Sequence, residues 1–223
     1  MSSSSAYRTP RGPLVTGVVF AATVAQLAVA TFATGLPQFS GKGFGARLVA
    51  YPLLMLLVPA LWLLAQRVRR GRGLGASSSP PWTAFALVMT PFLVDVTGNS
   101  LNLYDTVAWW DDANHFVNWI FLCTGIGLIV CRSLEPLWAV VVVVAGLGAL
   151  LAVAWELGEW FAFIRHGTEL DTAYEDTLGD EALGTLGGFV AAALVARRVR
   201  RARTRGRSSG DPARPGGRAA AGG

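Results

Sequence analysis

Six long apolar runs, separated by short polar breaks, constrain the fold of this chain more than any other feature. An α-helix needs about 20 apolar residues to cross roughly 30 Å of hydrocarbon. The runs cover residues 14 to 36, 46 to 65, 82 to 103, 113 to 131, 136 to 162 and about 177 to 196. The composition agrees, since 52% of the 223 residues are hydrophobic and only 15% are charged. We therefore predict an all-α, polytopic membrane bundle of about six transmembrane helices.

The arginine residues predict the orientation of these helices, because cytoplasmic loops retain Lys and Arg. They precede the first run and follow the second, fourth and sixth runs: Arg8, Arg11, Arg67, Arg69, Arg70, Arg72, Arg132, Arg197, Arg198, Arg200 and Arg201. The opposite connections are acidic after the first hairpin: Asp105, Asp111, Asp112, Glu169, Asp171, Glu175, Asp176 and Asp180. We expect a cytoplasmic segment over residues 1 to 13, both termini in the cytoplasm, and a bacterial-type cell (cytoplasmic) membrane. Cleavage of the first run as a signal peptide stays open, although the run is long for one.

The C-terminal segment, residues 197 to 223, differs from the rest of the chain in charge. It holds nine Arg and one Asp, a local charge of +8 within the net +5, so the first 196 residues carry −3. Its Arg, Gly, Pro and Ala residues show no apolar periodicity, which is typical of disorder. We expect a disordered cytoplasmic tail that contacts anionic lipid. A nucleic-acid-binding arm is disfavoured, because no aromatic residues interleave the arginines.

Polar residues share one face of the third run. Asp95, Asn99 and Asn102 follow i, i+4, i+7 spacing, which places them on the same side of a helix. A carboxylate near the middle of the bilayer costs on the order of 3 kcal/mol on insertion scales. We therefore predict that Asp95 and Asn99 face the interior of the bundle rather than lipid.

The start of the fourth run combines carboxylates with a histidine. Asp111 and Asp112 precede His115 by four and three residues, so one of them can orient the imidazole. Helix capping is the alternative role for one Asp, and we assign capping or a solvated charge to Asp111. Capping does not explain the histidine, so His115 and Asp112 are candidate metal ligands.

Two further carboxylate pairs lie near the end of the fifth run and the start of the sixth. Glu156 and Glu159 have i, i+3 spacing, so their side chains project in neighbouring directions from the helix. The sixth apolar stretch is too short to cross alone, so its helix is expected to start near Asp176, with Asp176 and Asp180 on one face. The alternatives are interfacial snorkelling for the two Glu residues and helix capping for Asp176.

These side chains together predict one outward-facing polar site built from four helices. Carboxylates with one imidazole suit Mg, Mn or Zn, and the same groups could relay protons. The candidate metal ligands are Asp112, His115, Glu156, Glu159, Asp176 and Asp180, and the candidate catalytic residues are His115, Glu156 and Asp176. No spacing among them is as diagnostic as HExxH.

The same residues carry a resemblance to a known family. The order Tyr104-Asp105, Asp112-x-x-His115-Phe116, Glu156-x-x-Glu159-Trp160 and Asp176-x-x-x-Asp180 before a Gly-rich helix resembles the YjdF-like inner-membrane proteins. A weaker similarity runs to VanZ-like proteins, which share the order acidic-His, Glu, Asp and a small-residue helix. The resemblance covers roughly residues 90 to 196 and implies the same membrane fold and polar site, but no reaction.

Three classes of function remain open. The site could activate water against a lipid-linked envelope substrate, although the sequence contains no HExxH or P-loop signature. It could bind a cation or proton in a small carrier, although no internal repeat is evident and six spans are few unless the chain forms a homo-oligomer. It could also be a structural network that holds helices together.

Overall fold

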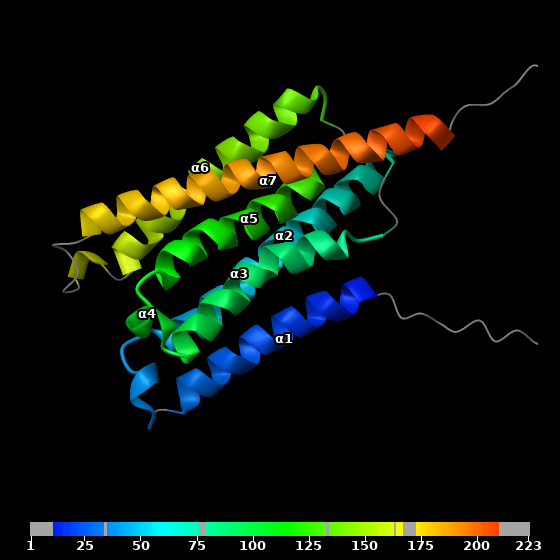
Figure 1. The fold of residues 1–223 in the computed structure, drawn as a ribbon. Helices are drawn as coiled ribbons and strands as arrows, with labels where there is room; N and C mark the ends of the chain where they lie inside the picture. Colours follow the sequence, from blue (N-terminus) through cyan, green and yellow to red (C-terminus); the bar gives the residue numbers. More distant parts are fainter. Residues whose placement is uncertain are drawn as a thin grey trace, which may run out of the picture.

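The computed structural model describes residues 11–33, 35–75, 79–132, 134–162, 164–166 and 173–209, and every regular element in them is helical. The long helices are α1 (Arg11–Phe32), α2 (Phe44–Gly71), α3 (Trp82–Ser100), α5 (Trp110–Val130), α6 (Leu137–Ala162) and α7 (Ala173–Ser209). Short elements connect them: η1 (Pro37–Phe39), α4 (Leu103–Thr106) and η2 (Ile164–His166) (Figure 1). The prediction of an all-α helical bundle is confirmed.

Five of these helices are long and apolar enough to cross a membrane: α1, α2, α5, α6 and α7. The remaining long helix, α3, has 19 residues and carries Asp95, Thr97, Asn99 and Ser100 in its last two turns. It packs between α1 on one side and α5 on the other, so protein rather than lipid faces much of its polar end. The protein is therefore a multi-pass membrane bundle in which α3 is the long helix that is not itself a candidate span.

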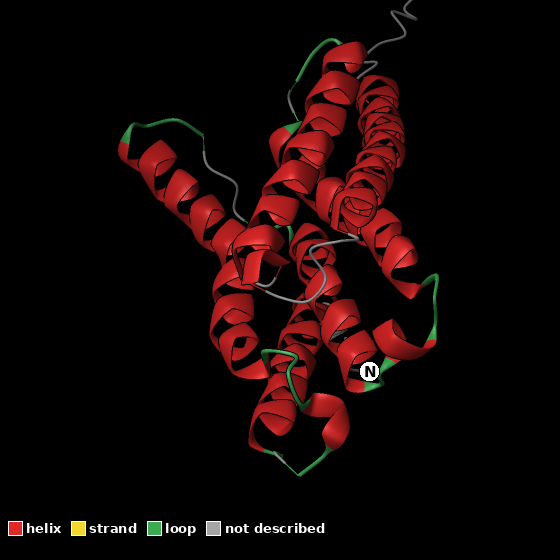
Figure 2. Cartoon of the chain, turned by 90° about the vertical axis from the view of Figure 1, so that its left-hand side faces the viewer, coloured by secondary structure: helices red, strands yellow, loops and turns green. Residues whose placement is uncertain are grey.

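The helices pack in two groups that meet along α3 and α5. One hydrophobic cluster lies among α1, α2 and α3 and includes Leu27, Tyr51 and Val96, while the other lies among α5, α6 and α7 and includes Val144 and Val195. Figure 2 looks at the end of the bundle where α1 ends and α5 and α7 begin. We refer to it below as the site end; it lies on the left in Figure 1.

Two glycines bring α6 and α7 into close contact. A Cβ atom added to Gly188 would lie 2.9 Å from the Cα atom of Gly148. Small residues of this kind let membrane helices approach backbone to backbone. The close approach places the last turns of α6 directly beside the first turns of α7, which is where the acidic residues of both helices lie.

The expectation of a disordered tail from residue 197 is wrong for its first part, because α7 continues as a helix to Ser209. Val199 is buried in the cluster of α5, α6 and α7. Arg203 donates from Nη2 to the Leu134 carbonyl oxygen at 2.5 Å, and its Nε lies 3.6 Å from Glu135. These contacts and the high helix propensity of Ala and Arg extend the helix. Residues 210–223 lie outside the described residues, as do Arg8, Glu169 and Asp171 of the charge pattern.

Candidate metal centre

His115 lies in the second turn of α5 and points into the interface with α6 and α7. It is only 7% exposed. Its ring stacks on the indole of Trp119, one turn further along α5, with 5.6 Å between centroids and 10° between planes. The indole Nε1 of Trp119 donates a hydrogen bond of 3.0 Å to the carbonyl oxygen of Gly148 on α6. The imidazole is thus held against a side chain that is itself fixed to the neighbouring helix.

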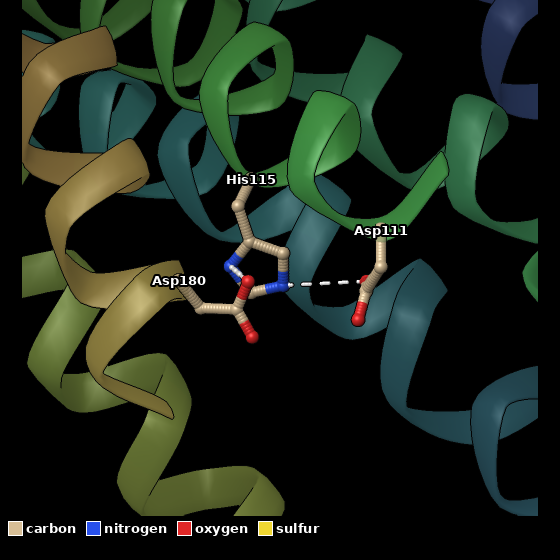
Figure 3. Close-up of side chains that lie close together, drawn as sticks. All are labelled: Asp111, His115 and Asp180. Atoms are coloured by element: carbon tan, nitrogen blue, oxygen red, sulfur yellow. Dashed lines mark ion pairs between the residues drawn. The ribbon is translucent and has the colours of Figure 1, made fainter. Parts of the chain in front are cut away.

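Carboxylates from three helices surround this imidazole. Its Nδ1 lies 3.6 Å from Asp180 Oδ1 on α7 and 3.8 Å from Glu156 Oε1 on α6. Its Nε2 lies 3.6 Å from Asp111 Oδ1, one turn earlier on α5. Figure 3 shows Asp111 and Asp180 on opposite sides of the ring. All three separations exceed the 2.7–3.2 Å of an N–H···O hydrogen bond, so the imidazole contacts these groups without pairing fully with any of them.

Burial makes these carboxylates unusual for a membrane bundle. Glu156 is 5% exposed and Asp180 is 3% exposed. The Oε1 atom of Glu156, which faces His115, is buried and has no hydrogen-bond partner within the described residues. A buried carboxylate without a counter-charge costs several kcal/mol. The arrangement is therefore incomplete without a proton or a cation.

Two overlapping groups of potential metal ligands result, with His115 common to both. The inner group is His115, Glu156 and Glu159, and the outer group is Asp111, His115 and Asp180. Within each group, one ligand atom per residue lies within 4.8 Å of those of the others. Both groups fit the chemistry of a site with one imidazole nitrogen and carboxylate oxygens.

The structure brings together four of the six ligands expected from the sequence, namely His115, Glu156, Glu159 and Asp180. Asp112 and Asp176 are exposed and belong to neither ligand group. Asp111, to which we assigned capping or a solvated charge, instead lies beside the imidazole. Its i, i+4 spacing from His115 was the signal for this contact. The sequence did not indicate that Trp119 belongs to the site, because an aromatic residue in an apolar run is ordinarily a packing residue.

Asp95 is the centre of a second polar network, which belongs to neither ligand group. Its carboxylate accepts hydrogen bonds from Arg47 Nη1 at 2.9 Å, from the Tyr51 hydroxyl and from the Tyr104 hydroxyl at 2.9 Å. Asn99 donates to it as well, at 3.1 Å. Burial, followed by the nearby Asp95 carboxylate, raises the pKa of Tyr104, so this hydroxyl stays a donor. Asp95 and Asn99 thus face the interior of the bundle and join α2, α3 and α4.

Comparison with known protein families identifies a match over most of the sequence. Residues 21–201 match the family described as "Predicted membrane protein (DUF2238)". No curated protein and no solved structure matches the sequence significantly. Because the match covers most of the chain, the protein belongs to this family of predicted membrane proteins.

Proposed function

We propose that this DUF2238 membrane protein binds a divalent metal cation among α5, α6 and α7, with His115 and Glu156 as its principal ligands. Glu159 and Asp180 complete the set. The observation that carries the proposal is the Oε1 atom of Glu156, which is buried, lacks a hydrogen-bond partner in the described part of the chain and lies 3.8 Å from His115 Nδ1.

The distances between the donor atoms suit a metal better than direct pairing. Zinc binds imidazole nitrogen and carboxylate oxygen at about 2.0–2.2 Å, which separates two tetrahedral ligands by roughly 3.4 Å. The separations of 3.6 Å to Asp180 and 3.8 Å to Glu156 exceed that value by only a few tenths of an ångström. Each of these two oxygens therefore lies close to the separation from Nδ1 that a shared cation would set.

The charge balance also favours a cation. Glu156 and Asp180 form ion pairs only with His115 among the described residues, and one imidazole cannot neutralise two carboxylates. Transition metals such as Zn²⁺ and Mn²⁺ accept this mixture of one nitrogen and several oxygens. Once bound, such a cation would supply Lewis acidity to a ligand at the site.

A proton is the second candidate ligand. Asp111 lies beside Nε2 of His115, while Glu156 and Asp180 lie beside Nδ1. An imidazole with carboxylates at both ring nitrogens can accept a proton on one side and release it on the other. Proton binding would account for the buried carboxylates without a metal, and the experiment below separates the two.

The wider setting completes the proposal. The Arg residues in the C-terminal parts of α2 and α7, and Arg132 after α5, lie toward the end of the bundle opposite to the site end. By the positive-inside rule we place the site on the outer side of a bacterial cytoplasmic membrane. Exposed arginines of α7, such as Arg197 and Arg201, would contact anionic lipid. We also propose that the DUF2238 family includes the YjdF-like proteins; the similarity to VanZ-like proteins has no support.

The test is metal analysis of the purified full-length protein, followed by titration of the metal-free protein with Zn²⁺ and with Mn²⁺. We expect about one equivalent of bound metal, and affinity reduced at least tenfold in His115→Ala and Glu156→Gln. Glu175→Gln, which removes an exposed carboxylate in the first turn of α7, is the matched control and should bind normally.

Two outcomes would contradict the proposal. A wild-type protein that binds neither metal would exclude it and leave the proton as ligand. Equal affinity in the wild type and in both ligand variants would show that the metal binds elsewhere. Circular dichroism and thermal unfolding of each variant separate a loss of binding from a loss of fold.

A further inference from the structure

The two ring nitrogens of His115 face carboxylates that differ in exposure. The side chain of Asp111, on the Nε2 side, is 46% exposed. Those of Glu156 and Asp180, on the Nδ1 side, are 5% and 4% exposed. The outer group of Asp111, His115 and Asp180 therefore extends toward the surface, whereas the inner group reaches the buried Glu156.

A neutral imidazole can ligate a cation at only one nitrogen at a time, because the other nitrogen carries the proton. The outer and inner groups both require His115. A cation bound through Nε2 beside Asp111 and a cation bound through Nδ1 beside Glu156 are thus alternatives. Asp180 belongs to the outer group. Its Oδ1 atom also lies 3.6 Å from Nδ1, the nitrogen of the inner position. The Asp180 carboxylate can therefore contact a cation in either position.

We propose that a divalent cation enters the site through an outer position formed by Asp111, His115 and Asp180, and then moves to the inner position at His115 and Glu156. The inference rests on the proposed function and adds a path to it. Asp111 is an entry ligand. It holds the cation while the cation loses bound water, and it releases the cation when Nδ1 becomes the coordinating nitrogen. Figure 3 shows the geometry of this outer position.

An entry ligand has a kinetic signature that a final ligand lacks. It stabilises an intermediate on the path and is absent from the end state. Its removal slows binding and release by the same factor and leaves the dissociation constant unchanged. Removal of a final ligand instead raises the dissociation constant, mainly through faster release.

The experiment uses Co²⁺, whose visible absorption reports coordination, with the metal-free full-length protein in a stopped-flow instrument. In Asp111→Asn we expect association and dissociation each to slow at least about fivefold, with the dissociation constant within about twofold of the wild type. In Glu159→Gln, which changes the inner group, we expect weaker binding through faster dissociation.

Asp112→Asn is the matched control, because it removes the same charge from the adjacent, exposed residue that lies in neither ligand group. If Asp112→Asn slows binding as much as Asp111→Asn, the effect is general electrostatic attraction and the path is wrong. Wild-type rates in Asp111→Asn would also exclude the path, and faster dissociation there would make Asp111 a final ligand. A wild-type protein that takes up no Co²⁺ would overturn the proposed function and the path together.

Discussion

His115 and Trp119 lie one turn apart on α5 with their rings stacked, and the indole of Trp119 is hydrogen-bonded to the carbonyl oxygen of Gly148 on α6. This relationship joins the orientation of the imidazole to the packing of a second helix. The site therefore depends on residues that cannot themselves bind a metal, such as Trp119 and the glycines of the contact between α6 and α7.

Replacing Trp119 with Phe should keep a ring against His115 but remove the indole donor. The Gly148 carbonyl loses a buried hydrogen bond, which costs about 1 kcal/mol within a membrane bundle. We expect a small fall in the free energy of unfolding and metal affinity reduced several-fold, because the imidazole is held less firmly. Titration with Zn²⁺ and denaturation in detergent measure the two effects. Unchanged affinity would show that the stacked indole does not position His115.

A Gly188→Ala substitution should destabilise the contact between α6 and α7. The added methyl group would lie 2.9 Å from the Cα atom of Gly148, and backbone cannot move away as a flexible side chain can. Overpacking of this kind costs about 1–3 kcal/mol. Gly146→Ala is the matched control on α6, since no atom lies within 4 Å of its added carbon. Equal unfolding temperatures for the two variants would argue against a tight contact.

Replacing Asp95 with Asn should destabilise the fold while leaving metal binding largely intact. The change removes one ion-pair partner of the mostly buried Arg47 guanidinium, and breaking a buried ion pair costs about 3–5 kcal/mol. Asp105→Asn serves as the control, because its carboxylate is exposed where it pairs with Lys42. Affinity for Zn²⁺ that falls in Asp95→Asn without a loss of stability would place Asp95 in the metal site instead.

Alkaline pH should reduce the stability that Tyr104 contributes through its hydrogen bond to Asp95. The pKa of Tyr104 is raised in the folded protein above its ordinary value near 10, so the folded state holds this proton more tightly than the unfolded state. Its contribution to stability is complete below pH 10 and declines as the pH rises above that value. We expect the unfolding temperature of the wild type to fall more steeply above pH 10 than that of Tyr104→Phe. Parallel curves would contradict this.

The fold could largely be predicted from the sequence, because the length of an apolar run and the cost of burying its charges are properties of each segment alone. Runs of about 20 apolar residues predict spanning helices whatever their neighbours are. The end of α7 could not be predicted in this way. The arginine-rich segment has no apolar periodicity, and its helical state depends on Val199 and Arg203 meeting the cluster and loop of α5 and α6.

The candidate site was only half determined by the sequence. The types and spacing of His115, Glu156 and Asp180 indicated ionisable groups that lipid would not tolerate, and therefore a polar interior. Which carboxylates of other helices reach the imidazole was a different matter, since these residues are far apart in the sequence.

Tertiary packing decided which carboxylates of α6 and α7 reach the imidazole, because the rotation and depth of α5 relative to these helices follow from contacts far along the chain. The approach of Gly148 to Gly188 and the anchoring of Trp119 accompany the contacts of His115 with Glu156 on α6 and Asp180 on α7. The sequence by itself thus determined that a membrane bundle contains buried carboxylates and a histidine. Only the packing of three helices determined which of them meet, because side-chain direction depends on helix rotation, which no local pattern specifies.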